Sequence, residues 1–187
     1  MYERIKRSNK RRRKADIVCF SFVAFFPRSV YNGGMLKFKI VAVGDMKEKY
    51  FRDAAEEYVK RLGKWAKTDI EEVKEASLAA DENKKREAEG KEILKRTKGF
   101  VILSDVKGKK VSSESFARMI EKCCLEGQSE ITFVIGGSNG VSEEVKAAAN
   151  EIISFGDITL PHRLFRVVLI EQIYRAETII NGISYHK

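Results

Sequence analysis

An apolar run at residues 131–135 (ITFVI) leads directly into a glycine-rich turn at residues 136–140 (GGSNG). A continuous apolar run with β-branched residues is typical of a strand buried in the middle of a parallel sheet. Glycine permits positive φ and lets a ligand approach the main chain closely. In open α/β sheets, ligands bind beyond the carboxyl ends of the strands. The two features together predict a central strand and a candidate binding loop, although an ordinary strand-to-helix turn explains the spacing equally well.

Strand and helix patterns alternate along the chain from residue 36 onward. We expect strands at residues 36–43, 67–73, 99–103 and 131–135. We expect helices at residues 45–62, in the charged stretch that ends at residue 98, and at residues 112–125, 141–152 and 164–180. This alternation predicts an α/β fold, with a mostly parallel sheet and helices on both of its faces.

Several local features refine these expectations. Asp45 lies three residues before Glu48, in an acidic variant of the capping box that would begin the first helix. Residues 107–110 (KGKK) are expected to form a basic turn. The apolar residues that we expect to anchor the charged helix are Ala88, Ile93 and Leu94. Helical spacing predicts one apolar face for the first helix, made of Tyr50, Phe51, Ala54, Ala55, Tyr58, Val59 and Leu62.

A second short polar turn at residues 154–160 precedes Pro161 and the last helix. Neither turn carries metal ligands or a nucleophile beside a base, which indicates a site built from the main chain. The glycine stretch matches neither the dinucleotide fingerprint nor the P-loop, and Ser138 does not stand in a nucleophile elbow. What remains is a binding or group-transfer site in which main-chain groups recognise a flat, polar ligand such as a nucleoside.

Composition limits the class of protein. A chain of 187 residues with 43% hydrophobic and 34% charged residues is typical of one globular domain with a sizeable core. The three cysteines include the adjacent pair Cys123 and Cys124, which lacks metal-ligand spacing. With only two histidines, we expect no metal site. The cysteine usage favours a reducing compartment, and we therefore expect the protein in the cytoplasm.

Residues 1–34 hold nine Lys/Arg against two acids, so seven of the nine net positive charges lie there. Their apolar run, residues 17–26, is too short to span a bilayer, which needs about 20 residues. A basic tail that contacts RNA is one interpretation. The other is that the native protein begins at Met35, with residues 1–34 a disordered or non-native extension. We expect residues 35–187 to be the functional domain.

Four segments of the chain resemble the RlmH family of SPOUT-class methyltransferases, which methylate N3 of a pseudouridine in large-subunit (23S) ribosomal RNA. The resemblance covers residues 35–187. It rests on KFKIVAVGDMKEKYFRDAAEEYVKRL (37–62), FVIGGSNGVSEEV (133–145), SFGDITLPHRLFRVVLIEQIYRA (154–176) and NGISYHK (181–187). The first 34 residues have no counterpart in it.

The resemblance implies a deep trefoil knot near the carboxyl end, a homodimer, and a bent S-adenosyl-L-methionine held by three main-chain loops. It implies that Leu103, Ile158 and Leu160 sandwich the adenine ring, with plain core packing as the alternative for Leu103 and Leu160. The full set of cofactor residues carried over by position is Leu103, Gly136, Phe155, Gly156, Asp157, Ile158, Thr159 and Leu160.

The methyl acceptor needs a second group of residues. The donor is already activated, so catalysis is mainly alignment, and a base or a cation would help the pseudouridine N3 lose its proton. Glu171 and Arg175 lie four residues apart, so a surface ion pair is the alternative for them. The resemblance of the whole tail favours His186. The catalytic candidates are Arg166, Glu171, Arg175, Tyr185 and His186, and His162 and Tyr174 are further candidates.

The partners follow from the same resemblance. It implies that the substrate is ribosomal RNA in the assembled ribosome, on the large subunit at the subunit interface. We expect no membrane and no metal as partners. Two other classes stay open: a knotted RNA-binding protein without activity, and a SPOUT enzyme that acts on transfer RNA.

Overall fold

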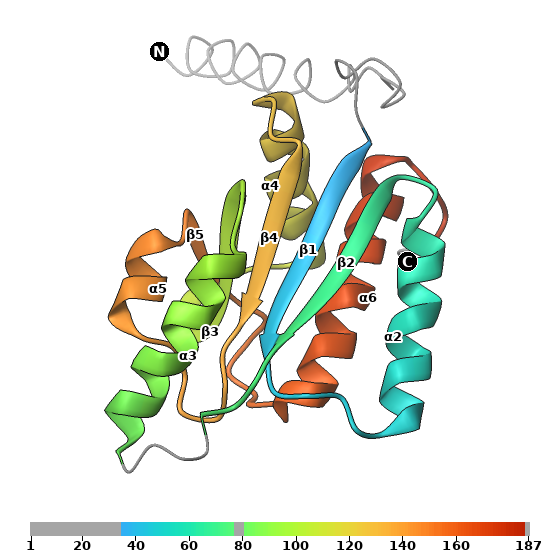
Figure 1. Cartoon of the computed structure of the whole chain (residues 1–187). Helices are drawn as coiled ribbons and strands as arrows, with labels where there is room; N and C mark the ends of the chain where they lie inside the picture. Colours follow the sequence, from blue (N-terminus) through green and yellow to red (C-terminus); the bar gives the residue numbers. More distant parts are fainter. Residues whose placement is uncertain (1–34, 77–80, 186–187) are drawn as a thin grey trace, which may run out of the picture. The chain divides into compact units, whose positions relative to one another are not determined.

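The structure is a computed structural model that describes residues 35–76 and 81–185 (Figure 1). Its centre is a five-stranded, all-parallel sheet in the order β2-β1-β4-β3-β5. The strands are β1 (Leu36–Val43), β2 (Ala66–Val73), β3 (Phe100–Lys110), β4 (Glu130–Ile135) and β5 (Glu151–Ser154). The predicted α/β class, the parallel sheet and the first four strands are confirmed.

Helices cover both faces of the sheet, as predicted. On one face lie α2 (Lys49–Leu62), α4 (Ser113–Leu125) and α6 (His162–Ile180), with α6 packed against both of the others. On the opposite face lie α3 (Glu82–Arg96) and α5 (Glu143–Ala148) (Figure 1). None of the helices in residues 35–76 and 81–185 is both long enough and apolar enough to cross a membrane.

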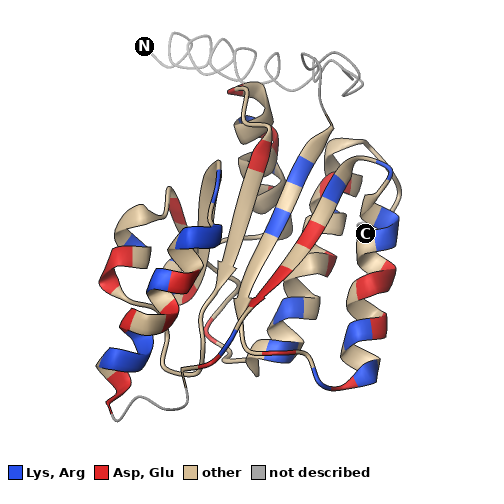
Figure 2. Cartoon of the chain, in the orientation of Figure 1, with Lys and Arg blue, Asp and Glu red and all other residues tan. Residues whose placement is uncertain are grey.

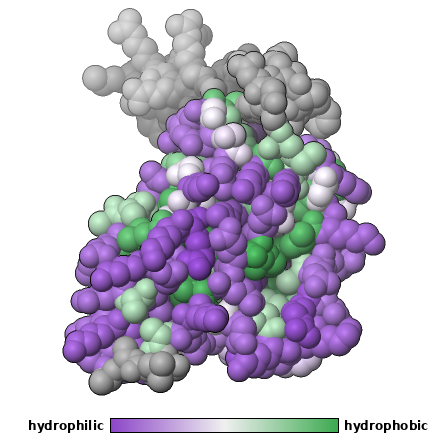
Figure 3. Space-filling view, viewed as in Figure 1, coloured by the Kyte–Doolittle hydropathy of each residue, from purple (hydrophilic) through white to green (hydrophobic). Residues whose placement is uncertain are grey.

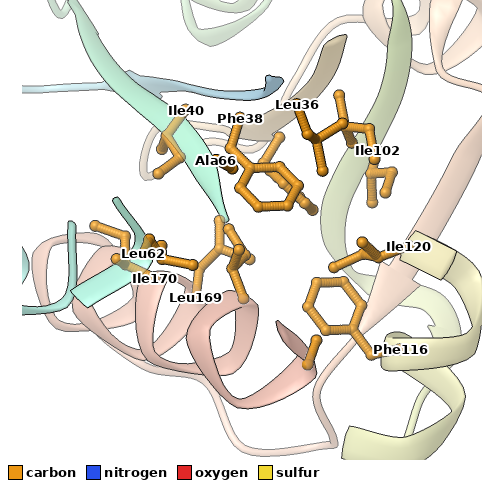
Figure 4. Close-up of a cluster of buried hydrophobic side chains, with 14 of the residues drawn as sticks. Leu36, Phe38, Ile40, Leu62, Ala66, Ile102, Phe116, Ile120, Leu169 and Ile170 are labelled. Carbon is orange, nitrogen blue, oxygen red and sulfur yellow. The ribbon is translucent and has the colours of Figure 1, made fainter. Parts of the chain in front are cut away.

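The alternation of side chains along each strand divides the core in two. Phe38 and Ile40 of β1 point to the face covered by α2, α4 and α6, where they meet Leu62, Phe116 and Leu169 (Figure 4). Val41 and Val43 point to the other face, toward α3 and α5. Strands buried on both faces need continuous apolar runs, which is why β1, β3 and β4 were readable in the sequence.

The predicted capping box at Asp45 and Glu48 is wrong. Helix α2 begins at Lys49 with Glu48 as its N-cap residue, and no side chain caps it. Asp45 and Glu48 instead contact Arg163 of α6. The Arg163 guanidinium lies 2.6 Å from Glu48 Oε1 and donates to the Asp45 carbonyl at 3.0 Å. An ion pair with another element therefore replaces the local cap.

Tyr50, predicted on the apolar face of the first helix, and Ala88, predicted as an anchor of the charged helix, are exposed. Tyr50 has 65% of its surface exposed because it lies at the start of α2, where its ring is tilted against that of Phe51 with 4.5 Å between the ring centroids. Ala88 faces solvent, while its neighbours Glu89 and Gly90 are buried. Gly90 packs so closely on α5 that a Cβ there would lie within hard contact of Ser142, and this approach sets the rotation of α3.

The basic turn predicted at residues 107–110 is part of β3. Ser104 and Lys109 both pair with Ile153 of β5, so the residues between them bulge out of the ladder. The helix expected at residues 141–152 is also wrong at its end, because α5 stops at Ala148 and residues 151–154 form β5. Strand β5 is only four residues long, too short to show a pattern in the sequence.

Charged residues occupy the upper parts of β1 and β2 in the view of Figure 2. Lys39, only 6% exposed, lies 2.7 Å from Glu71, and Lys37 lies 3.6 Å from Asp69. Figure 3 shows that this face of the molecule is largely hydrophilic, with small scattered hydrophobic areas. The charged ladder thus covers a part of the sheet where apolar side chains would face water.

Candidate functional site

A cavity of about 450 Å³ lies beside the ends of β4 and β5 and beside residues 104–106 of β3, where the apolar run of that strand ends. Its walls come from three strand-end segments, residues 104–106, 135–141 and 153–160, and from the first turns of α6. Parallel strands bring their carboxyl ends to one edge, so three loops far apart in sequence meet there. The glycine turn and the 154–160 turn were predicted to form one site, and both line this cavity.

The glycine turn is a tight, self-bonded loop. The Gly140 N–H donates to the Gly137 carbonyl at 3.0 Å, and Gly140 has φ +77°, a conformation that favours glycine. A Cβ on Gly136 would lie 2.7 Å from Val141 Cγ1. Gly136 is therefore needed for packing inside the loop as well as for any approach of a ligand.

The second loop is fixed at its start by a serine. Ser154 Oγ accepts from the Gly156 N–H at 3.2 Å and donates to the Gly156 carbonyl at 2.9 Å. Gly156 has φ +132°, and apart from its chain neighbours no described residue has an atom within 4 Å of the position that a Cβ would take. The Phe155 ring anchors the loop to the core, because it packs edge-on against Phe116 with 5.4 Å between centroids.

Six of the eight predicted cofactor residues line the cavity: Gly136, Phe155, Gly156, Ile158, Thr159 and Leu160. Asp157 does not, because its exposed carboxylate forms an ion pair with Lys110 at 2.6 Å. Leu103 is fully buried among the side chains under α3 and α5. Its side chain therefore cannot stack on a ligand in the cavity, which corrects the sandwich expected from Leu103; contact through its main chain stays a prediction.

The sequence did not single out all of the cavity wall. Ser104 and Asp105 follow the apolar run at residues 100–103 of β3 as the glycine turn follows β4, so the strand-end rule applied to every apolar run finds them. Phe165 and Val168 of α6 also line the cavity, three residues apart on one helix face. Helical spacing alone predicts that Phe165 and Val168 share one face of the helix, but it does not predict whether that face lines a cavity or packs in the core.

Arg166 lies inside the protein, with 1% of its surface exposed. Its guanidinium lies 2.6 Å from Glu72 Oε1 at the end of β2 and donates to the Gly44 carbonyl at 2.8 Å. The same Glu72 oxygen accepts from the Met46 N–H at 3.0 Å. Arg166 thus ties α6 to the ends of β1 and β2, and the geometry contradicts its predicted role as a contact for phosphate or for the reacting base.

His162 lines the cavity at the first residue of α6. Its Nε2 is buried without a hydrogen-bond partner among the described residues, 3.8 Å from Glu75 Oε1. His162 therefore lies between the cavity and the Glu75 carboxylate. Among the described residues, no group of three or more His, Cys, Asp or Glu side chains is placed to hold a metal ion.

Three of the catalytic candidates form one cluster near the carboxyl end of α6. The Arg175 guanidinium lies 2.6 Å from Glu171 Oε1, and the Tyr185 hydroxyl donates to the same oxygen at 3.1 Å. Arg175 also stacks over the Tyr185 ring at 4.9 Å. The predicted ion pair between Glu171 and Arg175 is confirmed, and Tyr174 packs edge-on against Tyr185.

The electrostatics of this cluster limit what its members can do. Hydrogen bonding to Glu171 raises the pKa of Arg175, which stays a cation. Burial raises the pKa of Tyr185 above its usual range, with Tyr58 and Glu171 adding to the effect. Tyr185 therefore acts as a neutral hydrogen-bond donor at neutral pH and not as a base.

The cluster and the cavity are separate within one chain. Arg175 comes seven residues after Val168, about 10 Å along the helix axis, and none of Glu171, Arg175 and Tyr185 lines the cavity. His186 lies outside the described residues. The structure therefore assembles most of the predicted cofactor residues but does not bring the acceptor candidates to them.

Comparison with known proteins adds sequence relatives and a fold relative. The family model described as "Predicted SPOUT methyltransferase" matches residues 36–186. Curated relatives named "Ribosomal RNA large subunit methyltransferase H" are 47% identical over 157 residues in Caldicellulosiruptor saccharolyticus and 49% identical over 159 residues in Lactobacillus acidophilus. The alignments cover 80% and 81% of this chain and 99% and 100% of the relatives.

Among solved structures, the tRNA (m1G37) methyltransferase of Aquifex aeolicus is similar, with a TM-score of 0.50 and 16% identity over 82% of this chain and 74% of that one. At that identity the likeness supports the fold alone. It agrees with the parallel sheet and its helices on both faces.

Proposed function

Since the chain belongs to the SPOUT methyltransferase family, we propose that it transfers the methyl group of S-adenosyl-L-methionine to N3 of a pseudouridine in large-subunit (23S) ribosomal RNA. The observation that carries this proposal is a cavity walled by main-chain loops, in a chain 47% identical to a ribosomal RNA large subunit methyltransferase H along 99% of that relative. The proposed catalytic domain is residues 35–187, and its place of action is the cytoplasm.

The cavity fits the cofactor in size and chemistry. Its volume of about 450 Å³ is in the range of small-ligand sites, about 300–1,000 Å³. Ile135, Ile153 and Leu160 give apolar contacts for a flat ring, and the turns at 136–140 and 156–160 give main-chain groups for its polar edge. When bound, the cofactor supplies an electrophilic methyl group on a sulfonium.

The chain's own residues would then align the acceptor and receive its proton. In the proposed arrangement, Arg175 supplies positive charge beside the N3 that becomes anionic, and Tyr185 and Glu171 hold the guanidinium in place. Hydrogen bonds and charge aimed at developing negative charge are worth about 100-fold or more in rate. His186, carried over from the family resemblance, is the proposed proton acceptor.

A homodimer would bring the cavity of one chain next to the Arg175 cluster of the other. The cluster around Arg175 lies about 10 Å beyond the cavity along α6, so one chain presents the methyl donor and the acceptor groups apart. A second copy packed on α6 would bring its own Arg175, Tyr185 and His186 to the cavity. The half-buried apolar residues of α6, Leu164 and Val167 among them, support such a contact.

A deep trefoil knot is part of the proposal. Strand β5 lies at the sheet edge beside β3, while the helix that follows it packs between α2 and α4 on one face. The turns at 136–140 and 154–160 line the same cavity although a helix and a strand separate them in sequence. These placements support a knot in which the segment that ends in α6 is threaded through a loop formed by the chain before it.

The substrate form is the assembled ribosome. Residues 35–187 carry a net charge of only +2, the chain's +9 less the +7 of residues 1–34, so unspecific attraction to RNA is weak. Specificity then comes from a shaped surface that meets a folded target.

A methylation assay with a labelled methyl donor tests the function. Whole ribosomes, isolated large subunits, free 23S RNA, a short hairpin with the target base, and transfer RNA are compared, and the product is located by mass spectrometry. We expect N3-methylpseudouridine in whole ribosomes and little product in the hairpin. Methylation of transfer RNA in preference to ribosomes, methylation of another base, or no methylation would overturn the proposal.

A further inference from the structure

A bulge in β3 stands at the rim of the cavity. Ser104 and Lys109 both pair with Ile153 of β5, so residues 105–108, here the β3 bulge, loop out between them. Asp105 Oδ1 accepts from the Lys107 N–H at 2.9 Å, which closes a local turn. A Cβ on Gly108 would lie 2.6–2.8 Å from the Ile153 main chain, so glycine lets the bulge press directly on β5. The bulge is therefore a built element with fixed ends.

One side of the β3 bulge belongs to the cavity and the other faces solvent. Asp105 and Val106 line the cavity, and so does Ile158 of the second loop. Val106 is 58% exposed and Ile158 82% exposed. The cavity mouth thus carries two exposed apolar side chains from different loops, which the ion pair between Lys110 and Asp157 ties together.

Lys107 and Lys109 stand beside this mouth without a carboxylate partner. Both are exposed, and neither forms an ion pair with a described residue. The acids near them hold other partners: Asp157 pairs with Lys110 at 2.6 Å, Glu143 pairs with Lys146 at 2.7 Å and interacts with Lys107 only through longer-range charge, and Asp105 accepts from the Lys107 main-chain N–H. Lysine ammonium groups that form no ion pair with the described residues are available to an anionic partner.

We propose that the β3 bulge is a docking ridge for the substrate RNA, in which Lys107 and Lys109 contact phosphates next to the methylated nucleotide. Val106 and Ile158 give an apolar contact for a base beside the target. The inference rests on the proposed function, because it assigns the RNA to the mouth of the same cavity. Since residues 35–187 are nearly neutral overall, two unneutralised charges at the mouth would account for much of their phosphate contact.

The test uses the full chain with Lys107→Gln/Lys109→Gln, and binding to ribosomes is measured against salt concentration. Loss of two phosphate contacts should lower the slope of log K against log salt by about 1.4–1.8. If the plots of log K against log salt for the unmodified chain and for the double variant meet near 1 M salt, the variant binds ribosomes about 20-fold more weakly near 0.15 M salt. We expect this loss in the KM for ribosomes and not in the affinity for S-adenosyl-L-methionine.

Lys60→Gln/Lys64→Gln is the matched control, since it removes the same charge from exposed positions near the opposite edge of the sheet. An equal change in slope in the control would show a general charge effect and overturn the ridge. An unchanged slope in Lys107→Gln/Lys109→Gln, or a parallel loss of cofactor affinity, would overturn it too. If the double variant lost binding to an acidic protein partner and kept its binding to RNA, the ridge would also be overturned.

Binding and turnover separate the two proposals. If the unmodified chain binds ribosomes but does not methylate them, the proposed function fails, while the salt slope still decides whether the ridge binds RNA. If it methylates ribosomes with an unchanged slope in the variant, the ridge fails and the function stands. Unfolding curves for both double variants check that each protein is folded.

Discussion

Removal of either partner of the Arg166–Glu72 ion pair should destabilise the protein, and the two single variants should differ in cost. The Arg166 side chain is 1% exposed and that of Glu72 is 43% exposed. After Arg166→Met, water can rehydrate the Glu72 carboxylate, and the main loss is the donor to the Gly44 carbonyl, about 1–3 kcal/mol. After Glu72→Met, a guanidinium stays buried without its carboxylate, which costs about 3–5 kcal/mol.

Urea unfolding of the full chain at one fixed protein concentration measures these costs. The double variant Arg166→Met/Glu72→Met removes the buried charge, so it should cost less than Glu72→Met alone. As a control, Lys49→Met breaks an exposed pair with Asp53, 79% and 55% exposed, and should cost no more than about 0.5 kcal/mol. The role of Arg166 as a buried link between α6 and the ends of β1 and β2 would be refuted by either of two results. The two single variants could lose equal free energies of unfolding, or the double variant could lose the sum of the two.

Four further outcomes are expected. Gly156→Ala should weaken cofactor binding by calorimetry about tenfold or more, about 1.4 kcal/mol, while Gly127→Ala, also at positive φ with open space around it, should leave binding intact; equal losses would exclude Gly156 from the site. Arg175→Ala and His186→Ala should each lower turnover on ribosomes roughly 100-fold with cofactor affinity kept, and normal turnover would remove them from the acceptor side. Light scattering at micromolar protein should give twice the chain mass of 21.3 kDa, and a monomer would contradict the shared site. Deletion of residues 1–34 should leave dimerisation, cofactor binding and methylation intact; a much flatter salt dependence of rRNA binding would instead identify these residues as an RNA contact.

The location of the site was predictable because strand ends leave a clear mark in the sequence. The run at 131–135 is apolar throughout, the residues that follow are glycines, and parallel strands collect such ends at one edge. The same logic places the turn at 154–160 beside it, even though β5 itself was not recognised. A four-residue edge strand contributes too few residues for any periodicity.

Side-chain direction was less predictable, because it depends on contacts between distant elements. Leu103 ends the apolar run of β3, but which face it points to is set by the pairing with Val134 and by α3. Arg166 looks like a surface cation in a helix, and only the fold brings Glu72, 94 residues away, to its guanidinium. Asp45 and Glu48 have the spacing of a cap, yet Arg163 from α6 takes their oxygens.

The ladder of charges on β1 and β2 has a consequence for how reliably the chain reaches its native state. A shift of β2 by one residue would turn Lys67, Asp69 and Glu71 toward Phe38 and Ile40 and take Ala66 and Ile70 out of that core, since successive side chains point to opposite faces. Lys39 of β1 would then lose Glu71 and Lys37 would lose Asp69, although Lys37 would keep Glu130 of β4 at 3.4 Å. Mispaired intermediates are therefore disfavoured both by buried charges and by lost ion pairs. Salt screens the ion pairs, so correct refolding should be more efficient at low ionic strength than in concentrated salt.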